Sequence, residues 1–174
     1  MRSIAIMVLL LTFALAGPAA AMELISPDLA PNGDIAKEQV YTRCGGGNIS
    51  PALAWKSVPA GTKSLAITMI DISVRPPGWS HWLVMNLPPS TTSLARGVSA
   101  LPAGATQPVT DFGYPKYDGP CPPKGTGKHS YQFTVWALRG AAPAIVQGAS
   151  AKDITAALGK EAIAQATLTG TYGQ

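Results

Sequence analysis

The sequence predicts a mostly β protein, an antiparallel β-sandwich with a small helical addition near the C-terminus. Many short segments alternate apolar and polar residues, and 18 glycines and 16 prolines supply turn signals between them. Only one stretch, residues 150–165, has convincing helical spacing. No repeat, low-complexity segment or linker divides the chain, so we expect residues 22–174 to form one domain.

The first 21 residues have the features of a secretory signal peptide. Arg2 gives a positive start, and Ile4–Leu15 is an apolar run shorter than a membrane span. Ala19 and Ala21 give the small-x-small pattern of a cleavage site. A membrane anchor or a buried helix is the alternative. We therefore expect an exported protein, periplasmic or secreted, that is cleaved near Ala21.

The first part of the domain reads as short strands and loops. A strand and a turn are expected at Met22–Asp34, a second strand at Ile35–Tyr41 and a third at Ala52–Trp55. Gly45–Gly47 could suggest a phosphate cradle, but no helix and no Lys-Ser/Thr pair follow to complete a P-loop.

Two buried strands carry the first candidate site residues. Leu65–Ile70 is continuously apolar and ends at Asp71, and His81–Leu87 follows a short loop of proline and glycine. Residues 88–115 are irregular. A connection this long inside a compact domain is usually functional or has local order of its own.

A strand with two filled faces follows a loop rich in glycine and proline. Residues 131–138 alternate, and His129 stands where the loop enters the strand. The chain has only two histidines, His81 and His129, and both lie at such a boundary. Because rigid sheets position functional loops, we expect the two loops to converge on one pocket.

The C-terminal region predicts a helix and a final strand. Ser150 followed by Asp153 resembles a capping box, and the helix is expected over Ser150–Gln165 with an interruption at Gly159. Thr167–Tyr172 alternates and predicts the last strand.

The chain is mildly basic and has no nucleic-acid-binding motif. The formal net charge of +4 falls to +3 without Arg2. Lys116, Lys124 and Lys128 gather around the proposed pocket, either as solubilising residues or as a positive rim that attracts anions. No basic helix or zinc-binding spacing is present, so we expect no nucleic-acid partner.

The two cysteines, Cys44 and Cys121, are expected to pair. An even number of cysteines in an exported chain favours a disulfide. Two separate free thiols remain the alternative, because sequence cannot show whether the residues approach within bridging distance.

The candidate ligand-binding side chains are Asp71, His81, His129 and Tyr131. Imidazoles donate hydrogen bonds and carry positive charge when protonated, which suits a phosphate or carboxylate. Asp71 is expected to orient one imidazole and keep it protonated. The alternatives are structural histidines, an aspartate that caps a turn and a core tyrosine. The predicted walls of the pocket are Trp79 and the Gly119–Pro123 loop, with Gly119 and Pro122 as its candidate ligand-binding residues.

Three motifs resemble the phosphatidylethanolamine-binding protein family, which includes the Raf kinase inhibitor proteins and a bacterial branch. They are NISPALAW at 48–55, HWLVMNLP at 81–88 after a strand that ends in aspartate, and GPCPPKGTGKHSY at 119–131. The resemblance runs from Leu24 to Tyr172. Two features depart from the family pattern: residues 71–76 read DISVRP in place of Asp-Pro-Asp-Ala-Pro, and Ser130 replaces an arginine.

The resemblance implies a β-sandwich with a small anion pocket, lined by the matching acid, both histidines and the tyrosine. Such pockets accept phosphate, phosphorylethanolamine or acetate-like groups, and family members are mostly non-catalytic. Bacterial relatives are often homodimers, so a homodimer is expected by analogy.

We therefore expect an exported, non-enzymatic binding protein for a small anion, with no cofactor and no bound metal. One alternative is an inhibitor of a protein partner, such as an extracellular or periplasmic protease. A less favoured alternative is an acid–base or metal-dependent phosphoester hydrolase. A serine-hydrolase mechanism is disfavoured, because Ser130 follows His129 directly and should point to the opposite face of the strand.

Overall fold

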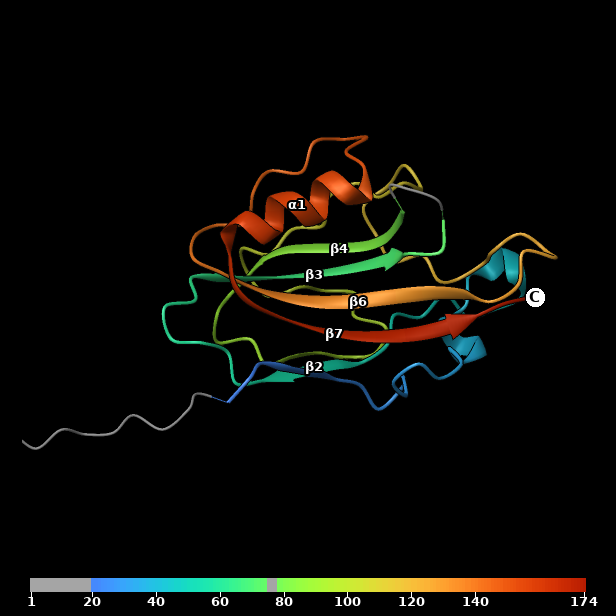
Figure 1. Cartoon of the computed structure of the whole chain (residues 1–174), viewed down its shortest axis with the longest axis horizontal. Coiled ribbons are helices and arrows are strands. Elements are labelled where there is room, and N and C mark those ends of the chain that lie inside the picture. Colours follow the sequence, from blue (N-terminus) through green and yellow to red (C-terminus); the bar gives the residue numbers. More distant parts are fainter. Residues whose placement is uncertain (1–19, 75–77) are drawn as a thin grey trace, which may run out of the picture.

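Two antiparallel sheets form the protein in a computed structural model that describes residues 20–74 and 78–174 (Figure 1). Most of the predicted signal peptide and the loop residues 75–77 lie outside the described residues. The larger sheet has the order β4-β3-β6-β7, and the smaller has the order β1-β2-β5. The strands are β1 (Glu23–Ile25), β2 (Leu53–Lys56), β3 (Ser64–Asp71), β4 (Trp79–Leu87), β5 (Ser93–Leu94), β6 (His129–Leu138) and β7 (Ala162–Tyr172).

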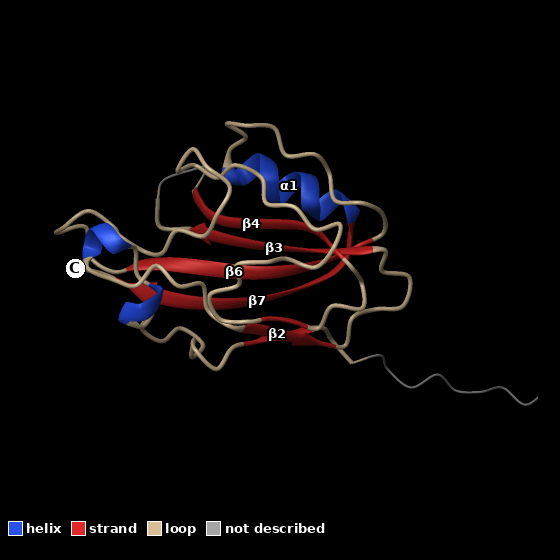
Figure 2. Ribbon diagram, turned by 180° about the vertical axis from the view of Figure 1, so that it is seen from behind, coloured by secondary structure: helices blue, strands red, loops and turns tan. Residues whose placement is uncertain are grey.

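The main core lies between the two sheets. Ile67 and Met69 of β3 and Phe133 of β6 are fully buried on the inner face of the larger sheet. They pack in one cluster with Leu53 and Trp55 of β2. Loops cover the rest of this face, as the view from behind shows (Figure 2). The alternation of the strands therefore produces the predicted β-sandwich.

A second apolar cluster attaches helix α1 (Ala151–Glu161) to the outer face of the larger sheet. Ile154 and Leu158 of the helix pack against sheet residues that include Leu83 and Trp136. The Ser150 hydroxyl accepts a hydrogen bond from the backbone N–H of Asp153, which confirms the predicted cap. No helix within residues 20–74 and 78–174 is long and apolar enough to cross a membrane.

Three predicted elements differ from the structure. The segment Ile35–Tyr41 is not a strand: it holds the 3-10 helix η1 (Lys37–Gln39). Helix α1 runs through Gly159 and ends at Glu161, so the expected interruption and the extension to Gln165 are both wrong. The last strand starts at Ala162, five residues before the predicted start, because pairing with β6 outweighs the helix propensity of the alanines.

The two cysteines form the expected disulfide, with Cα atoms 5.6 Å apart. Cys44 ends the 3-10 helix η2 (Thr42–Cys44), and Cys121 lies in the loop before β6. The bond joins parts of the chain 77 residues apart and fixes the loop that approaches the C-terminal end of β3.

Candidate functional site

A cavity of about 280 Å³ lies at the end of the larger sheet where β3 finishes. Six of the seven predicted site residues line it: Asp71, Trp79, His81, Pro122, His129 and Tyr131. Gly119 does not. It packs against the backbone of Gln39 and Val40, where any side chain would collide. The structure therefore brings the two predicted loops together in one pocket.

Sheet register places three of these residues on one face. Asp71 of β3 pairs with Tyr131 of β6, and His129 lies two residues before Tyr131 on the same strand. Residues two apart on a strand share a face, so all three project towards the inner face of the sheet. Tyr131 belongs to the main core cluster, and Asp71 and His129 lie at its end, where the core meets the cavity.

A β-bulge brings His81 to this same face. Met69 pairs with Trp82 and Ile70 pairs with Ser80, so His81 is an extra residue in β4. The strict alternation of β4 would point His81 and Trp82 to opposite faces, whereas a bulge turns both towards the inner side. The His81 ring lies between the rings of Tyr131 and Phe112, with centroid distances of 5.2 and 5.1 Å.

His129 is held at both ring nitrogens. Its Nδ1 lies 2.7 Å from the Asp71 carboxylate, and its Nε2 lies 3.0 Å from the Thr126 hydroxyl. That hydroxyl donates its own hydrogen to the carbonyl of Pro123, at 2.8 Å. Both ring nitrogens then act as donors, which is the arrangement of a charged imidazolium beside a carboxylate. Both side chains are buried, so the cavity wall contains a histidine–carboxylate contact shielded from water.

His81 is set up differently. Its Nδ1 donates to the backbone carbonyl of Asp118, at 2.7 Å. Burial lowers the pKa of His81, outweighing this hydrogen bond and the nearby charges of Asp71 and Asp111, which act to raise it. A neutral His81 with a proton on Nδ1 has its Nε2 lone pair free. The two histidines therefore differ: the His129 ring faces a carboxylate, whereas the His81 ring faces a backbone carbonyl.

The hydroxyl of Tyr131 is buried and has no hydrogen-bond partner among the described residues. Burial raises the pKa of this hydroxyl, and the negative charge of Asp71 adds to the effect. Tyr131 thus keeps its proton, and the Asp71 carboxylate lies close enough to influence this hydroxyl but forms no well-oriented hydrogen bond with it. A buried donor without a partner is costly unless a ligand or water completes it.

The loop beside the cavity is fixed by a side chain far away in sequence. Asn48 donates to the Asp118 carboxylate at 3.3 Å and accepts from the backbone N–H of Gly119 at 2.8 Å. The backbone N–H of Asp118 donates to the His81 carbonyl, and the Asp118 carbonyl accepts from the His81 ring. The backbone of Asp118 therefore contacts both the backbone and the ring of His81. Asn48 and the disulfide therefore hold the acceptor that orients His81.

Sequence reasoning missed two walls of the cavity, Phe112 and Val74. Phe112 comes from the long irregular connection, whose unusual length was the one available signal. None of Lys116, Lys124 and Lys128 lines the cavity, so of the two alternatives for these lysines the lining does not favour a positive rim. Lys128 is paired with Asp34 at 2.5 Å, and the Lys116 amino group lies 4.5 Å from the centre of the Tyr114 ring.

The cavity offers one unpaired donor, one open ring nitrogen and little that could react. His129 supplies positive charge, Tyr131 a neutral O–H, and His81 a nitrogen that can accept or gain a proton. In the described part of the chain, no three His, Cys, Asp or Glu residues are grouped as metal ligands. Ser130 lies on the opposite face of β6 from His129, as predicted from the alternation.

Comparison with known proteins defines the class. The family model described as phosphatidylethanolamine-binding protein matches residues 25–173. YbcL of Escherichia coli (strain K12) is 36% identical over 180 residues, which cover 99% of this chain and 98% of YbcL. The chain therefore belongs to the phosphatidylethanolamine-binding protein family.

Other relatives agree with this assignment. The crystal structure of YbcL, described as a new member of the mammalian family, has a TM-score of 0.82 and covers 89% of this chain and 99% of its own. YbhB of the same bacterium is 40% identical over 158 residues, or 87% of this chain and 99% of YbhB. The lipoprotein LppC of Mycobacterium tuberculosis (strain ATCC 25618 / H37Rv) is 36% identical over 158 residues, or 89% of this chain and 75% of LppC.

Proposed function

We propose that this protein binds a small anion, a phosphate or a phosphate-monoester head group, in the histidine-lined cavity without catalysing a reaction. The observation that carries the proposal is the buried Asp71–His129 pair at the cavity wall. A desolvated ion pair contributes little to stability by itself, so its place at a cavity favours a binding role.

The neighbouring groups complement a partly protonated phosphate. The imidazolium of His129 attracts a negative oxygen, and the unpaired O–H of Tyr131 donates to an oxygen lone pair. The free Nε2 of His81 accepts a hydrogen bond from a P–OH group or takes up its proton. Pro122, Pro123 and the aromatic side chains form stiff walls around these groups.

The site supports binding better than hydrolysis. His129 is engaged at both nitrogens, and a general base must be free to take a proton from the nucleophile. His81 alone has an open nitrogen, and a single base without an adjacent nucleophile does not form a hydrolytic pair.

We also propose that the protein acts outside the cytoplasm. The disulfide favours an oxidising compartment, and the relative LppC is named as a lipoprotein. The apolar N-terminal run and its small-x-small pattern suit cleavage after Ala21. Intact mass measurement of the exported protein should then give a chain that begins at Met22, and a full-length chain would contradict the proposal.

Calorimetric titration with phosphate and phosphorylethanolamine at pH 6 and pH 8 tests the proposed ligand class. We expect binding that is stronger at pH 6 and lost in the His81→Ala, His129→Ala double variant, whose far-ultraviolet spectrum should stay native. Lys124→Gln is the matched control, because Lys124 is exposed in the same loop and does not line the cavity. Absence of binding at both pH values would overturn the proposal.

A further inference from the structure

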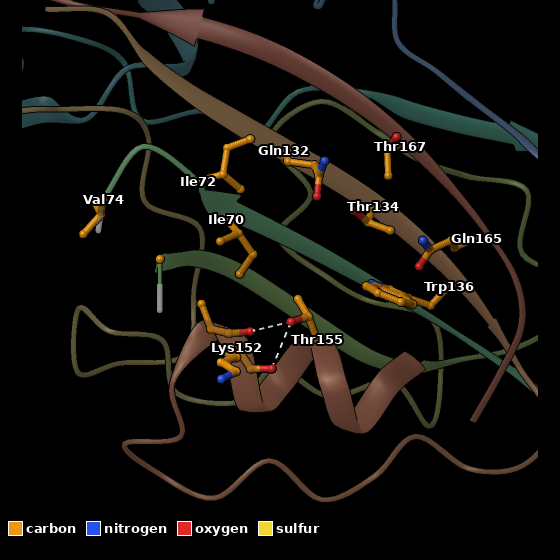
Figure 3. A pocket seen from close by; sticks show the side chains of 12 residues that line it. Ile70, Ile72, Val74, Gln132, Thr134, Trp136, Lys152, Thr155, Gln165 and Thr167 are labelled. Carbon is orange, nitrogen blue, oxygen red and sulfur yellow. Dashed lines mark hydrogen bonds between the residues drawn. The ribbon is translucent and has the colours of Figure 1, made fainter. Parts of the chain in front are cut away.

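A second cavity, of about 420 Å³, lies on the outer face of the larger sheet beside the start of α1 (Figure 3). Residues of β3, β6 and β7 form its floor, and α1 forms one wall. It lies on the opposite side of the sheet from the histidines: Ile70 and Ile72 line it, whereas Asp71 between them lines the first cavity. The two cavities thus lie on opposite faces of the sheet, and Val74 is the one described residue that lines both.

The apolar part of this groove suits a flat hydrocarbon body. Trp136 and Ile70 are buried in the floor, and Ile72 is 51% exposed at the edge. Gly78 closes one end, because its backbone passes close to Ile70 and to Ala151 of the helix. A slot of this size between a sheet and a helix matches the space that small organic ligands occupy.

One buried threonine in the groove makes no side-chain hydrogen bond to a described residue. Thr134 is only 2% exposed, and no hydrogen bond joins its hydroxyl to another described residue. By contrast, the buried Trp136 N–H beside it donates to Thr68 at 3.1 Å, and the Thr155 hydroxyl donates to carbonyls of its own helix. Thr134 therefore has a donor and acceptor free for a ligand, and Gln132 lies next to it on β6 (Figure 3).

The positive charge beside the groove favours a negatively charged ligand. Among the described residues that line the groove, Lys152 in the first turn of α1 is the only ionisable one. The positive end of the helix dipole lies at this same end. The nearby Asp153 carboxylate is occupied by the Ser150 hydroxyl and does not line the groove. These features favour a single negative charge at the helix end of the slot.

We propose that this groove binds a small planar organic anion, an apolar ring body that carries one carboxylate or sulfonate. The rings lie on Trp136 and Ile70, a polar substituent reaches the Thr134 hydroxyl, and the anionic group lies near Lys152 and the start of α1. Binding here is independent of the proposed anion site among the histidines.

Fluorescence titration with 8-anilinonaphthalene-1-sulfonate tests this site, and neutral N-phenyl-1-naphthylamine serves as the uncharged comparator. We expect saturable binding of the sulfonate. Thr134→Val should weaken it about fivefold through loss of the hydroxyl, and Thr134→Ser should bind like the native protein. Lys152→Gln should weaken the sulfonate roughly threefold and leave the neutral dye unchanged.

Thr169→Val is the matched control. Thr169 lies on β7 two residues after Thr167, on the same face of the sheet, and does not line the groove. It should bind both dyes normally. The proposal is overturned if no saturable binding occurs, or if Thr134→Val and Lys152→Gln both leave sulfonate binding unchanged. It is also overturned if inorganic phosphate displaces the dye or His129→Ala abolishes its binding, since the dye would then occupy the other cavity.

Discussion

The carboxylate of Asp71 and the imidazole of His129 meet across neighbouring antiparallel strands, with Oδ2 and Nδ1 2.7 Å apart. Asp71 is the last residue of β3, and His129 is the first residue of β6. The pair is buried and its charges face a cavity, so the sheet register itself builds the charged wall of the proposed anion site.

Replacing Asp71 by Asn should weaken phosphate binding at pH 6 by about tenfold, because the neutral amide no longer favours a charged His129. The free energy of unfolding should fall by only about 1–2 kcal/mol, since His129 can release its proton instead of remaining an unpaired buried charge. Calorimetry and urea unfolding measure the two effects. Asp34→Asn is the control: it removes an exposed ion pair with Lys128 and should change neither the phosphate affinity nor the free energy of unfolding appreciably. Equal phosphate affinity in the Asp71 and Asp34 variants would contradict the assigned role of Asp71.

Tyr131→Phe should separate binding from stability. Its hydroxyl has no partner in the described chain, so removing it should not lower the free energy of unfolding. Phosphate affinity should fall about fivefold through loss of one donor. Tyr117→Phe is the matched comparison, because that buried hydroxyl donates to the Gln39 carbonyl at 2.8 Å.

The Tyr117 variant should lose about 1 kcal/mol of stability and keep its phosphate affinity. The reverse pattern, a destabilised Tyr131→Phe protein with normal phosphate binding, would show that Tyr131 is only a core residue.

Anion binding should take up protons. The pKa of buried His81 is lowered, so His81 is neutral in the free protein near pH 7. A bound anion near its open Nε2 favours the protonated ring and raises that pKa. Affinity must then increase as pH falls. Calorimetry in two buffers of different ionisation enthalpy, corrected for the titration of phosphate itself, should show net proton uptake; net release would contradict this role of His81.

The same lowered pKa has a consequence for stability. In the unfolded chain His81 takes up a proton as the pH falls below its ordinary pKa of about 6.5. In the folded protein the pKa of His81 is lower, so the ring takes up its proton only at a more acidic pH. The contribution of His81 to stability is therefore lost as pH falls below about 6.5. Urea unfolding of the native protein and His81→Phe between pH 5 and 8 measures it. The native curve should decline more steeply towards acid.

Much of the fold could be predicted from local patterns. The strands β3 and β6 were expected within two residues of their observed limits, because each carries continuous apolar or alternating residues. Local signals failed where long-range pairing decides: the alanine-rich start of β7 is drawn into a strand by β6, although alanine favours helix.

The site was predictable to a similar extent. Histidines and an aspartate at strand ends marked the cavity, since such boundaries lie together at one edge of a sheet. The direction of His81 was not predictable, because it depends on a bulge that only pairing with β3 defines. Nor could the sequence show that Asn48 holds the loop whose Asp118 carbonyl accepts a hydrogen bond from the His81 ring. Asn48 and this loop meet only in the folded chain.

The disulfide should contribute to both the fold and the cavity. Cys121 lines the cavity, and its bond to Cys44 closes a long segment of chain. A Cys44→Ser, Cys121→Ser double variant should lose about 4 kcal/mol in urea unfolding and bind phosphate more weakly. Dithiothreitol should lower the stability of the native protein towards that of the variant and leave the variant unchanged. Equal stability of the two proteins without reductant would refute this contribution.

The most direct test of the histidine-lined anion site is a nitrogen-15 spectrum of the two imidazole rings during titration with phosphate at pH 6.5. The site predicts that Nε2 of His81 moves towards the protonated shift, and that both rings respond with the dissociation constant found by calorimetry. Two unmoved rings at saturating phosphate would contradict the central claim that the Asp71–His129 pair and His81 form the binding site.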